Sequence, residues 1–552
     1  MKYSKIFLFM AFIAFYGCGN GRDLNTKVSN TTGWNYNDKH SFDFQAAEGL
    51  STTPVGMIPI EGGTFNIGET DEFITAPRNN AHRQISVGSF YMDKYEINNL
   101  NWQEYVAWVK NVFGITAPNL VNKAKPDSSV WQEDLAYNDP YIQNYFESTM
   151  FSFYPVVGVT WEQAMRFCQW RTDRVNEMLL IKAGLIDYPD YRSLTKYYDA
   201  TERAEWEKEH APYKMDSIIA QDEIKKNGSG ETDSTEDSVT YQFFPGHDYI
   251  CEQFIFNTDK YYKDDSYNPE HGRKNLYDKF GNERKVNLKD GMLVISYRLP
   301  TEAEWEFAAY APVATGPDSL TIEGKIYPWS GYHPRDLSET KTKGILQANF
   351  VRGRGDLMGV SGALNDGYII TAPVDAYLPN DFGLYNMAGN VNEWVLDVYR
   401  ETTNQEFEEY HSFRGNIFVR PKYDEKGNLM IDSLGCTEVE VVEGGDKRDV
   451  HDGDIASQIE TNYPLDSTNA KLPEGVKPSY DPTDILVPRI TSNARVYKGG
   501  SWKDRIYWLN PSTRRYLEQD KCSSTIGFRC AMSALGDQIT PEKMIFPQKK
   551  QK

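Results

Sequence analysis

The cysteines are the residues best suited to redox or metal chemistry, and their spacing limits which chemistry is open to them. None forms a C-x-x-C pair, the spacing typical of zinc sites and dithiol redox centres. Six cysteines in 552 residues are also too few for a disulfide-dense scaffold. Cys522 and Cys530 lie close enough in sequence for one local disulfide, and the alternative is that both are buried free thiols. The full set is Cys18, Cys168, Cys251, Cys436, Cys522 and Cys530.

Other catalytic patterns are scarce. The eight histidines include no pair four residues apart, which is the spacing of a metalloprotease helix. Gly353, Gly355 and Gly359 do not have the spacing of a dinucleotide-binding loop. The net charge of -20, with no concentrated basic stretch, argues against binding to nucleic acid. Spacing alone therefore predicts no catalytic residues.

The amino terminus has the pattern of a bacterial lipoprotein signal. Lys2 and Lys5 precede a mostly apolar run at residues 6–16, and Cys18 follows directly after Gly17. The run makes only ~17 Å of helix, too short for a ~30 Å hydrocarbon core, so we predict a cleaved signal peptide at residues 1–17. Cys18 resembles the lipidated cysteine of a lipobox, and the alternative is an ordinary secreted protein. The expected location is the outer membrane, lipid-anchored, on its periplasmic face.

Capping chemistry predicts three helix starts. Asn101 with Glu104, Thr160 with Gln163 and Thr301 with Glu304 each place an N-cap acceptor three residues before a side chain that can reach back to its amide. Two short strands are predicted around a Gly-Gly turn between residues 58 and 68, and another strand at residues 89–97.

The chain divides into a tether, one large domain and a tail. Residues 18–56 are polar and predict a flexible tether. The domain spans residues 57–531 and carries two polar insertions, at about 171–296 and 399–490. Residues 532–552 form a C-terminal tail.

A series of motifs inside this domain resembles the formylglycine-generating enzyme, or sulfatase-modifying factor, family. Each motif is weak alone, but their shared order is specific. The blocks are Glu61–Phe65, Tyr91–Asn99, Pro155–Trp161, Arg298–Glu306, Tyr327–Trp329, Ala348–Phe350, Thr371–Val374, Phe382–Trp394, Lys498–Trp502 and Ile526–Arg529.

The resemblance implies an α+β fold related to C-type lectins, with little regular secondary structure and long insertions. In active family members, a cysteine pair shortly after the Gly-Gly-Ser-aromatic block holds the catalytic copper. The matching positions here are Asp504 and Leu509, which supply no thiolate for Cu(I). We therefore expect no bound copper and no oxidase activity.

The resemblance also implies two calcium sites built from hard oxygen ligands. Asn349, Asp366 and the carbonyls of Phe350 and Tyr368 would form one. The alternative for Asn349, Asp366 and Glu393 is that they simply cap turns. The second set comprises Gly389, Glu393 and the carbonyls of Ala388 and Val391.

A lipobox joined to a body of this family that lacks the catalytic cysteine pair is similar to the gliding-motility and type IX secretion lipoproteins of Bacteroidota. That resemblance implies a structural role, with other gliding and secretion proteins of the outer membrane and periplasm as partners. Two alternatives stay open: a formylglycine-generating oxidase acting on sulfatases, and a lectin-like glycan-binding module.

Overall fold

The structure is a computed structural model, and only part of the chain is described. Cys18, Cys251, Cys436 and the signal peptide at residues 1–17 lie outside that part. The described residues are 54–69, 80, 82–113, 118–133, 136–186, 256–263, 276–277, 283–284, 286, 293–312, 325–329, 332–337, 343–352, 366–400, 419–424, 429–431, 437–441 and 493–535.

A three-stranded antiparallel sheet joins the two ends of the domain. Its central strand, β4, pairs with a strand on each edge, and its side chains are buried because they pack into the two core clusters on either face of the sheet. The two strands predicted around the Gly-Gly turn do form, but they do not pair with each other: the first joins this sheet, and the second makes a separate ribbon. The three-stranded sheet has the order β1 (Met57–Ile60), β4 (Phe90–Asp93), β13 (Ala531–Ser533), and the ribbon is β2 (Gly63–Ile67) with β3 (Arg83–Val87).

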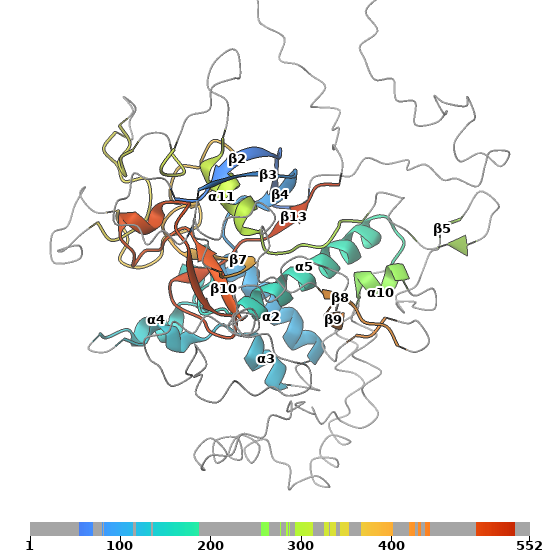
Figure 1. The fold of residues 1–552 in the computed structure, drawn as a ribbon. Helices are drawn as coiled ribbons and strands as arrows, with labels where there is room; N and C mark the ends of the chain where they lie inside the picture. Colours follow the sequence, from blue (N-terminus) through green and yellow to red (C-terminus); the bar gives the residue numbers. More distant parts are fainter. Residues whose placement is uncertain are drawn as a thin grey trace, which may run out of the picture.

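A second sheet lies at the centre of the molecule (Figure 1). Its strand β7 is buried at every residue except Leu396. It pairs antiparallel with β10 and parallel with β12. The order is β11 (Arg515–Glu518), β10 (Ala494–Lys498), β7 (Asn392–Val398), β12 (Ile526–Gly527). Two small ribbons pair β5 (Leu276–Tyr277) with β6 (Glu283–Arg284), and β8 (Val419–Pro421) with β9 (Val439–Val441).

The helices pack around these sheets. Figure 1 shows α2 beside α5, with α3 next to α2 and α11 close to β2 and β3. The α-helices are α2 (Asn99–Phe113), α3 (Pro118–Ala124), α4 (Asp139–Asn144), α5 (Trp161–Lys182), α10 (Thr258–Lys263) and α11 (Glu302–Tyr310). Short 3₁₀ turns are η1 (Ser128–Trp131), η2 (Thr149–Phe151) and η5 (Ile506–Leu509).

Two of the three predicted helix starts are confirmed. Thr160 and Gln163 form a reciprocal capping box at the start of α5, and Thr301 and Glu304 do the same for α11. The third prediction is wrong, because α2 begins at Asn99 and Asn101 lies inside its first turn. There the Asn98 side chain accepts a hydrogen bond from the Asn101 amide at 2.9 Å, so the same chemistry acts three residues earlier than expected.

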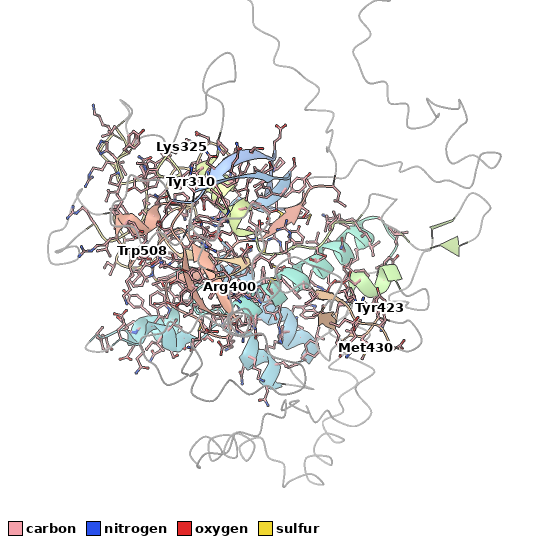
Figure 2. The ribbon with its side chains drawn as sticks, viewed as in Figure 1. Tyr310, Lys325, Arg400, Tyr423, Met430 and Trp508 are labelled. Atoms are coloured by element: carbon pink, nitrogen blue, oxygen red, sulfur yellow. The ribbon has the colours of Figure 1, made fainter. Side chains whose placement is uncertain are left out.

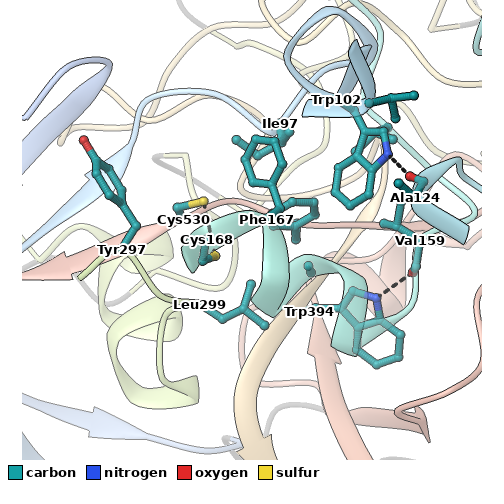
Figure 3. Packing of buried hydrophobic residues seen from close by; sticks show 14 of the residues in the cluster. Ile97, Trp102, Ala124, Val159, Phe167, Cys168, Tyr297, Leu299, Trp394 and Cys530 are labelled. Carbon is teal, nitrogen blue, oxygen red and sulfur yellow. Dashed lines mark hydrogen bonds between the residues drawn. The ribbon is translucent and has the colours of Figure 1, made fainter. Parts of the chain in front are cut away.

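The main core lies between α2, α5 and β7 (Figure 3). The Trp102 and Phe167 rings stack with centroids 5.2 Å apart. The Trp102 indole donates to the Ala124 carbonyl at 2.9 Å, and the Trp394 indole donates to the Val159 carbonyl at 3.1 Å. These bonds satisfy the polar atom of each buried ring, so both tryptophans fill the core without an unpaired donor.

The first insertion is tied to the body more closely than its composition suggested. Helix α5 runs on to Lys182, so the boundary placed at residue 171 falls inside a helix. Asp173 accepts the Thr258 amide at 2.8 Å, and Asn176 accepts the Val294 amide at 2.8 Å. At the other end of the domain, β13 extends to Ser533, past the predicted start of the tail. Within the described residues, no helix combines the length and apolar character needed to cross a bilayer.

Candidate functional site around Asp504

The site begins where strand β10 ends in a Gly-Gly turn. Gly500 has φ of 71°, and a Cβ there would lie 2.8 Å from the Trp508 carbonyl oxygen. Such an approach is closer than a side chain permits, so glycine lets the turn pack directly against η5. The residues between the turn and η5 are therefore held in a fixed loop that contains Asp504.

Buried ion pairs anchor the strand that leads into this turn. Lys498 is fully buried, and its Nζ lies 3.0 Å from Glu302 Oε1 and 2.7 Å from Glu306 Oε2, both on α11. Burial alone would raise the pKa of Glu302, but the charges of Arg514 and Lys498 outweigh it and lower that pKa to about 2. Glu302 is therefore ionised at neutral pH and fixes β10 against α11.

Asp504 is held by a bidentate ion pair with Arg515 on β11. Arg515 Nη1 lies 2.8 Å from Asp504 Oδ1, and Nη2 lies 2.7 Å from Oδ2. The Ser501 hydroxyl donates to Oδ2 at 2.6 Å, and the Asn392 amide donates to the same oxygen at 3.3 Å. Arg515 also donates to Asn392 Oδ1 at 2.6 Å, so β7, the loop and β11 meet at one carboxylate.

These contacts set the charge of Asp504. Partial burial would raise the pKa of this carboxyl, but the hydrogen bonds and charge of Arg515, with those of Ser501 and Asn392, hold it below its usual value. The carboxylate is therefore ionised at neutral pH, neutralised by a guanidinium and weakened as a general base. Its side chain is 17% exposed, which shelters the pair from water.

Leu509, at the end of η5, is fully buried. It packs in a cluster with Tyr327, Leu346, Phe350 and Ala388. A side chain in this position contributes to packing and offers no ligand atom. The two positions that match the family's copper cysteines thus hold an ion-paired carboxylate and a core leucine, and this residue set does not fit copper.

The described cysteines lie elsewhere, and the possible Cys522–Cys530 disulfide is not formed. All three are free thiols. Cys530 Sγ lies 3.5 Å from Cys168 Sγ in the main core (Figure 3), while Cys522 Sγ donates to Asp127 Oδ2 at 3.8 Å. Of the two alternatives left open by the sequence, the structure has free thiols, because closeness in sequence did not bring these side chains together: the Cys530 side chain packs inward against α5.

The first predicted calcium set is brought together by the fold. Asp366 accepts hydrogen bonds from the Phe350 amide at 3.0 Å and the Tyr368 amide at 3.1 Å. The Asn349 side-chain amide donates to the Ile370 carbonyl at 2.8 Å. These oxygens are of the hard type that calcium prefers, so the residues fit such a site. The same hydrogen bonds are also those expected of a carboxylate that caps a turn.

In the second predicted calcium set, the Glu393 carboxylate is not available to a metal ion. Glu393 is fully buried, and its two oxygens lie 2.6 and 2.7 Å from Arg529, with the Trp305 indole donating to one of them at 2.7 Å. An adjacent guanidinium repels a divalent cation, so Glu393 does not fit as a calcium ligand. Gly389 instead makes a close contact: a Cβ on it would lie 2.5 Å from the Asn349 carbonyl oxygen. The remaining members, Ala388 and Val391, are buried.

Within the described residues, no group of three or more His, Cys, Asp or Glu side chains is placed to hold a metal ion. Sequence reasoning identified Asp504 but missed its partners Arg515 and Asn392. Neither belongs to a spacing pattern that marks a charge partner, although the acid at position 504 was itself a signal that a cation should lie nearby.

Comparison with known proteins agrees with the motif order. A family profile described as "Sulfatase-modifying factor enzyme 1-like domain" matches residues 44–534. Formylglycine-generating enzyme of Bos taurus is 20% identical over 422 residues, which cover 76% of this chain and 78% of the bovine protein. Formylglycine-generating enzyme of Mus musculus is 32% identical over 139 residues, covering 25% of this chain and only 32% of the mouse protein.

The relatives also include a protein named as inactive. Inactive C-alpha-formylglycine-generating enzyme 2 of Bos taurus is 34% identical over 105 residues, covering 19% of this chain and 27% of that protein. Among solved structures, PvdO from Pseudomonas aeruginosa aligns with a TM-score of 0.35 at 14% identity, covering 87% of this chain and 94% of that one. Treponema denticola variable protein 1 aligns with a TM-score of 0.33 at 16% identity, covering 87% and 95%.

The profile match covers most of the chain and includes the turn, the loop and both sheets described above. The chain therefore belongs to the sulfatase-modifying factor family and carries a formylglycine-generating-enzyme-like domain.

Proposed function

We propose that this protein is a non-catalytic member of its family, anchored in the outer membrane by lipid on Cys18, that serves as a structural component of the gliding motility and type IX protein secretion machinery. The lipoprotein GldJ is the protein it resembles in the regions around residues 31–38 and 155–177, with GldK and PorK as close alternatives. The bidentate ion pair between Asp504 and Arg515 is the observation that supports the non-catalytic part.

Cysteine oxidation by copper needs a soft ligand pair that a substrate thiol can approach. Here the first position carries a carboxylate already neutralised by a guanidinium, and the second carries a leucine with no exposed surface. The bovine relative named as inactive is precedent for a family member without the activity. We infer that the loop now stabilises the body of the protein.

The location and partners rest on the lipobox and on the resemblance. A protein tethered through residues 18–56 would place its domain beside the periplasmic face of the membrane. Its partners would be other gliding and secretion proteins there, and the two insertions, at 171–296 and 399–490, are the segments most suited to contact them. Calcium at Asn349, Phe350, Asp366 and Tyr368 would be a structural ion that holds together the two loop segments that contain these residues.

The enzymatic alternative is tested directly with the purified full chain. We expect no Cu(I) binding under anaerobic titration and no conversion of a sulfatase-motif cysteine to formylglycine, measured by the mass of the peptide. An active formylglycine-generating enzyme is the positive control. Copper bound at one equivalent together with substrate conversion would overturn the proposal. A glycan array that finds a specific ligand would favour the lectin-like alternative instead.

The structural role is tested in the native envelope. Cross-linking followed by mass spectrometry should recover outer-membrane or periplasmic secretion proteins as neighbours. Cys18→Ser should abolish labelling with a radioactive fatty acid and release the chain from the membrane fraction, while Cys522→Ser should change neither. Cross-links only to unrelated proteins, or fatty-acid labelling that survives Cys18→Ser, would contradict the proposal.

A further inference from the structure

The side chain of Glu96 is a buried acid that the site around Asp504 does not use. Glu96 follows β4 and is only 2% exposed. Figure 2, drawn from the same side as Figure 1, shows side chains crowded around β7, and Glu96 lies against the loop at residues 386–391 that leads into this strand. In such surroundings an ionised carboxylate needs a positive charge or hydrogen-bond donors on both of its oxygens.

The two oxygens of Glu96 have unequal partners. Oε2 accepts hydrogen bonds from the Asn386 side-chain amide at 2.9 Å and from the Asn390 side-chain amide at 2.8 Å. Oε1 is buried and has no hydrogen-bond partner among the described residues. Because an ionised carboxylate shares its charge between its two oxygens, Oε1 would carry negative charge with no donor to stabilise it.

The Asn386 amide lacks the kind of partner that a protonated Glu96 provides. Its nitrogen donates to Glu96 and also to the Val374 carbonyl at 3.1 Å. Its Oδ1 is buried without a donor in the part of the chain that the structure describes. A protonated carboxyl group has one O–H donor, whereas an ionised one only accepts. A proton on Glu96 therefore removes the charge from Oε1 and adds a donor beside an amide whose acceptor is unused.

The neighbouring charges favour the same proton. Glu393 on β7 is a second buried acid, and the Arg529 guanidinium donates to both of its oxygens. The other hydrogen bonds of Arg529 go to two backbone carbonyls. One guanidinium thus lies near two acids and pairs directly with Glu393. Burial and the charge of Glu393 raise the pKa of Glu96 to about 8, against the opposing effects of Arg529 and the two asparagine amides.

Tyr145 and Asp93 are further ionisable groups near this network, and neither supplies positive charge. The Tyr145 hydroxyl, at the end of α4, donates to the Pro155 carbonyl at 2.7 Å, and burial raises its pKa, so it stays neutral. Asp93, on β4 itself, forms its ion pair with Arg171 at 2.6 Å.

We propose that Glu96 keeps a proton in the folded protein at neutral pH, and that loss of this proton weakens the contact between the end of β4 and the loop that leads into β7. The neutral acid joins these two segments through the amides of Asn386 and Asn390. When the proton passes to solvent water, two carboxylates lie near one guanidinium and repel each other. The junction between the two sheets is therefore sensitive to rising pH.

The isosteric variant Glu96→Gln copies the neutral acid and has no proton to lose. Because the pKa of Glu96 is raised from 4.5 to about 8, its contribution to stability is fully present below about pH 4.5 and is lost as the pH rises to about 8. The unfolding equilibrium constant of the wild type, divided by that of Glu96→Gln, should increase about tenfold per pH unit between about pH 5 and pH 8 and level off above. Urea unfolding of the full chain at each pH measures this ratio.

Glu393→Gln is the matched control, because it makes the same chemical change at a carboxylate that is ion-paired. It should be less stable than the wild type across the whole range, since it leaves Arg529 without its counter-ion. A ratio for Glu96→Gln that does not change with pH would overturn the proposal. So would a Glu96→Gln chain that fails to fold, or is destabilised as strongly as Glu393→Gln, at about pH 6.

Infrared spectroscopy gives a readout that does not depend on stability. The full chain, with ¹³C in its glutamate carboxyl groups, should show the carbonyl stretch of a protonated carboxylic acid at about pH 6, and part of this band should fade as the pH is raised to about 9. That part should be missing from Glu96→Gln, and from Glu96→Met, which is neutral and of similar length. If the wild type has no such band at about pH 6, Glu96 is ionised and the proposal is wrong, whatever the variants do.

Discussion

The guanidinium of Arg529 grips both carboxylate oxygens of Glu393, at 2.6 and 2.7 Å, and neither side chain has any exposed surface. Removing one partner of such a pair leaves an uncompensated charge in the interior. Glu393→Gln should therefore lower the free energy of unfolding by roughly 3–5 kcal/mol, measured by urea titration.

The same variant also tests whether Glu393 acts through its ion pair with Arg529 or as a calcium ligand. If Glu393 stabilises the fold only through Arg529, the loss in Glu393→Gln should be equal in calcium-containing and chelator-containing buffer. A loss seen only when calcium is present would return Glu393 to the metal ligands.

Asp504→Asn tests the loop that stands at the position of the family's cysteines. It keeps the shape of the side chain but removes the charge that faces Arg515 on β11. The pair is only partly exposed, so we expect a loss of about 1–3 kcal/mol in unfolding free energy.

The matched control is Glu440→Gln, which breaks the exposed pair with Arg420. That pair has side chains 41% and 66% exposed, and we expect a change below about 1 kcal/mol. Equal effects of the two variants would mean that Asp504 has no special structural role.

Oxidation of the native protein distinguishes the two thiol pairings. Treatment with diamide, which accepts two electrons and two protons from a thiol pair, should join Cys168 to Cys530, because their sulfurs lie 3.5 Å apart. Peptide mapping of the oxidised protein by mass spectrometry identifies the linked cysteines.

Cys522 should stay reduced under the same conditions. Its sulfur contacts Asp127, while the Cys168 and Cys530 sulfurs contact each other, so neither of those two thiols is placed to join it. A recovered Cys522–Cys530 peptide would restore the pairing suggested by closeness in sequence.

Acid should weaken the anchor between α11 and β10. The pKa of Glu302 is lowered from its ordinary value near 4.5 to about 2, so its ionised form stabilises the fold fully above about pH 4.5, and this stability is lost as the pH falls toward 2. Glu302→Gln should be about 3–5 kcal/mol less stable than the wild type at neutral pH.

The difference in unfolding free energy between the wild type and Glu302→Gln should then narrow as the pH falls from about 4.5 to about 3. Urea unfolding at each pH measures this difference. A gap that stays constant across this range would show that Glu302 is not ionised through its contacts with Lys498 and Arg514.

Calcium at the first set depends on the Asp366 carboxylate. If the ion binds there, a chelator should lower the melting temperature of the wild-type protein by several degrees, and Asp366→Asn should remove that response. Elemental analysis after calcium dialysis gives an independent count of bound metal. An unchanged melting temperature and no bound calcium would leave Asp366 as a turn-capping residue.

Local chemistry explains which parts of the fold were predictable. The capping boxes at Thr160 and Thr301 depend on residues three positions apart, so the sequence contains all the information needed. At α2, three asparagines within four positions offer more than one cap, and packing selects Asn98. Strand pairing is less local: the sequence predicted β1 and β2 on either side of a Gly-Gly turn but not their partners, and β1 pairs with β4, about thirty residues further along the chain.

The candidate site, too, has features that the sequence shows and features that only the folded chain creates. The residues at positions 504 and 509 could be read from the motif that precedes them, but their environments could not. Arg515 reaches Asp504 because β11 lies beside β10, a relationship that only the folded sheet creates. The unpaired Oε1 atom of Glu96 is also invisible in sequence, since most buried polar atoms find a partner.

At the position where an oxidase of this family keeps its reactive centre, the loop that contains Asp504 instead links β10 to β11 through Arg515. Placing cysteines at positions 504 and 509 would leave Arg515 without its counter-ion and a void where Leu509 fills the core. A return to redox chemistry would therefore require changes at Arg515 and in the packing around position 509 as well as the two cysteines. The loss of folding stability opposes that return.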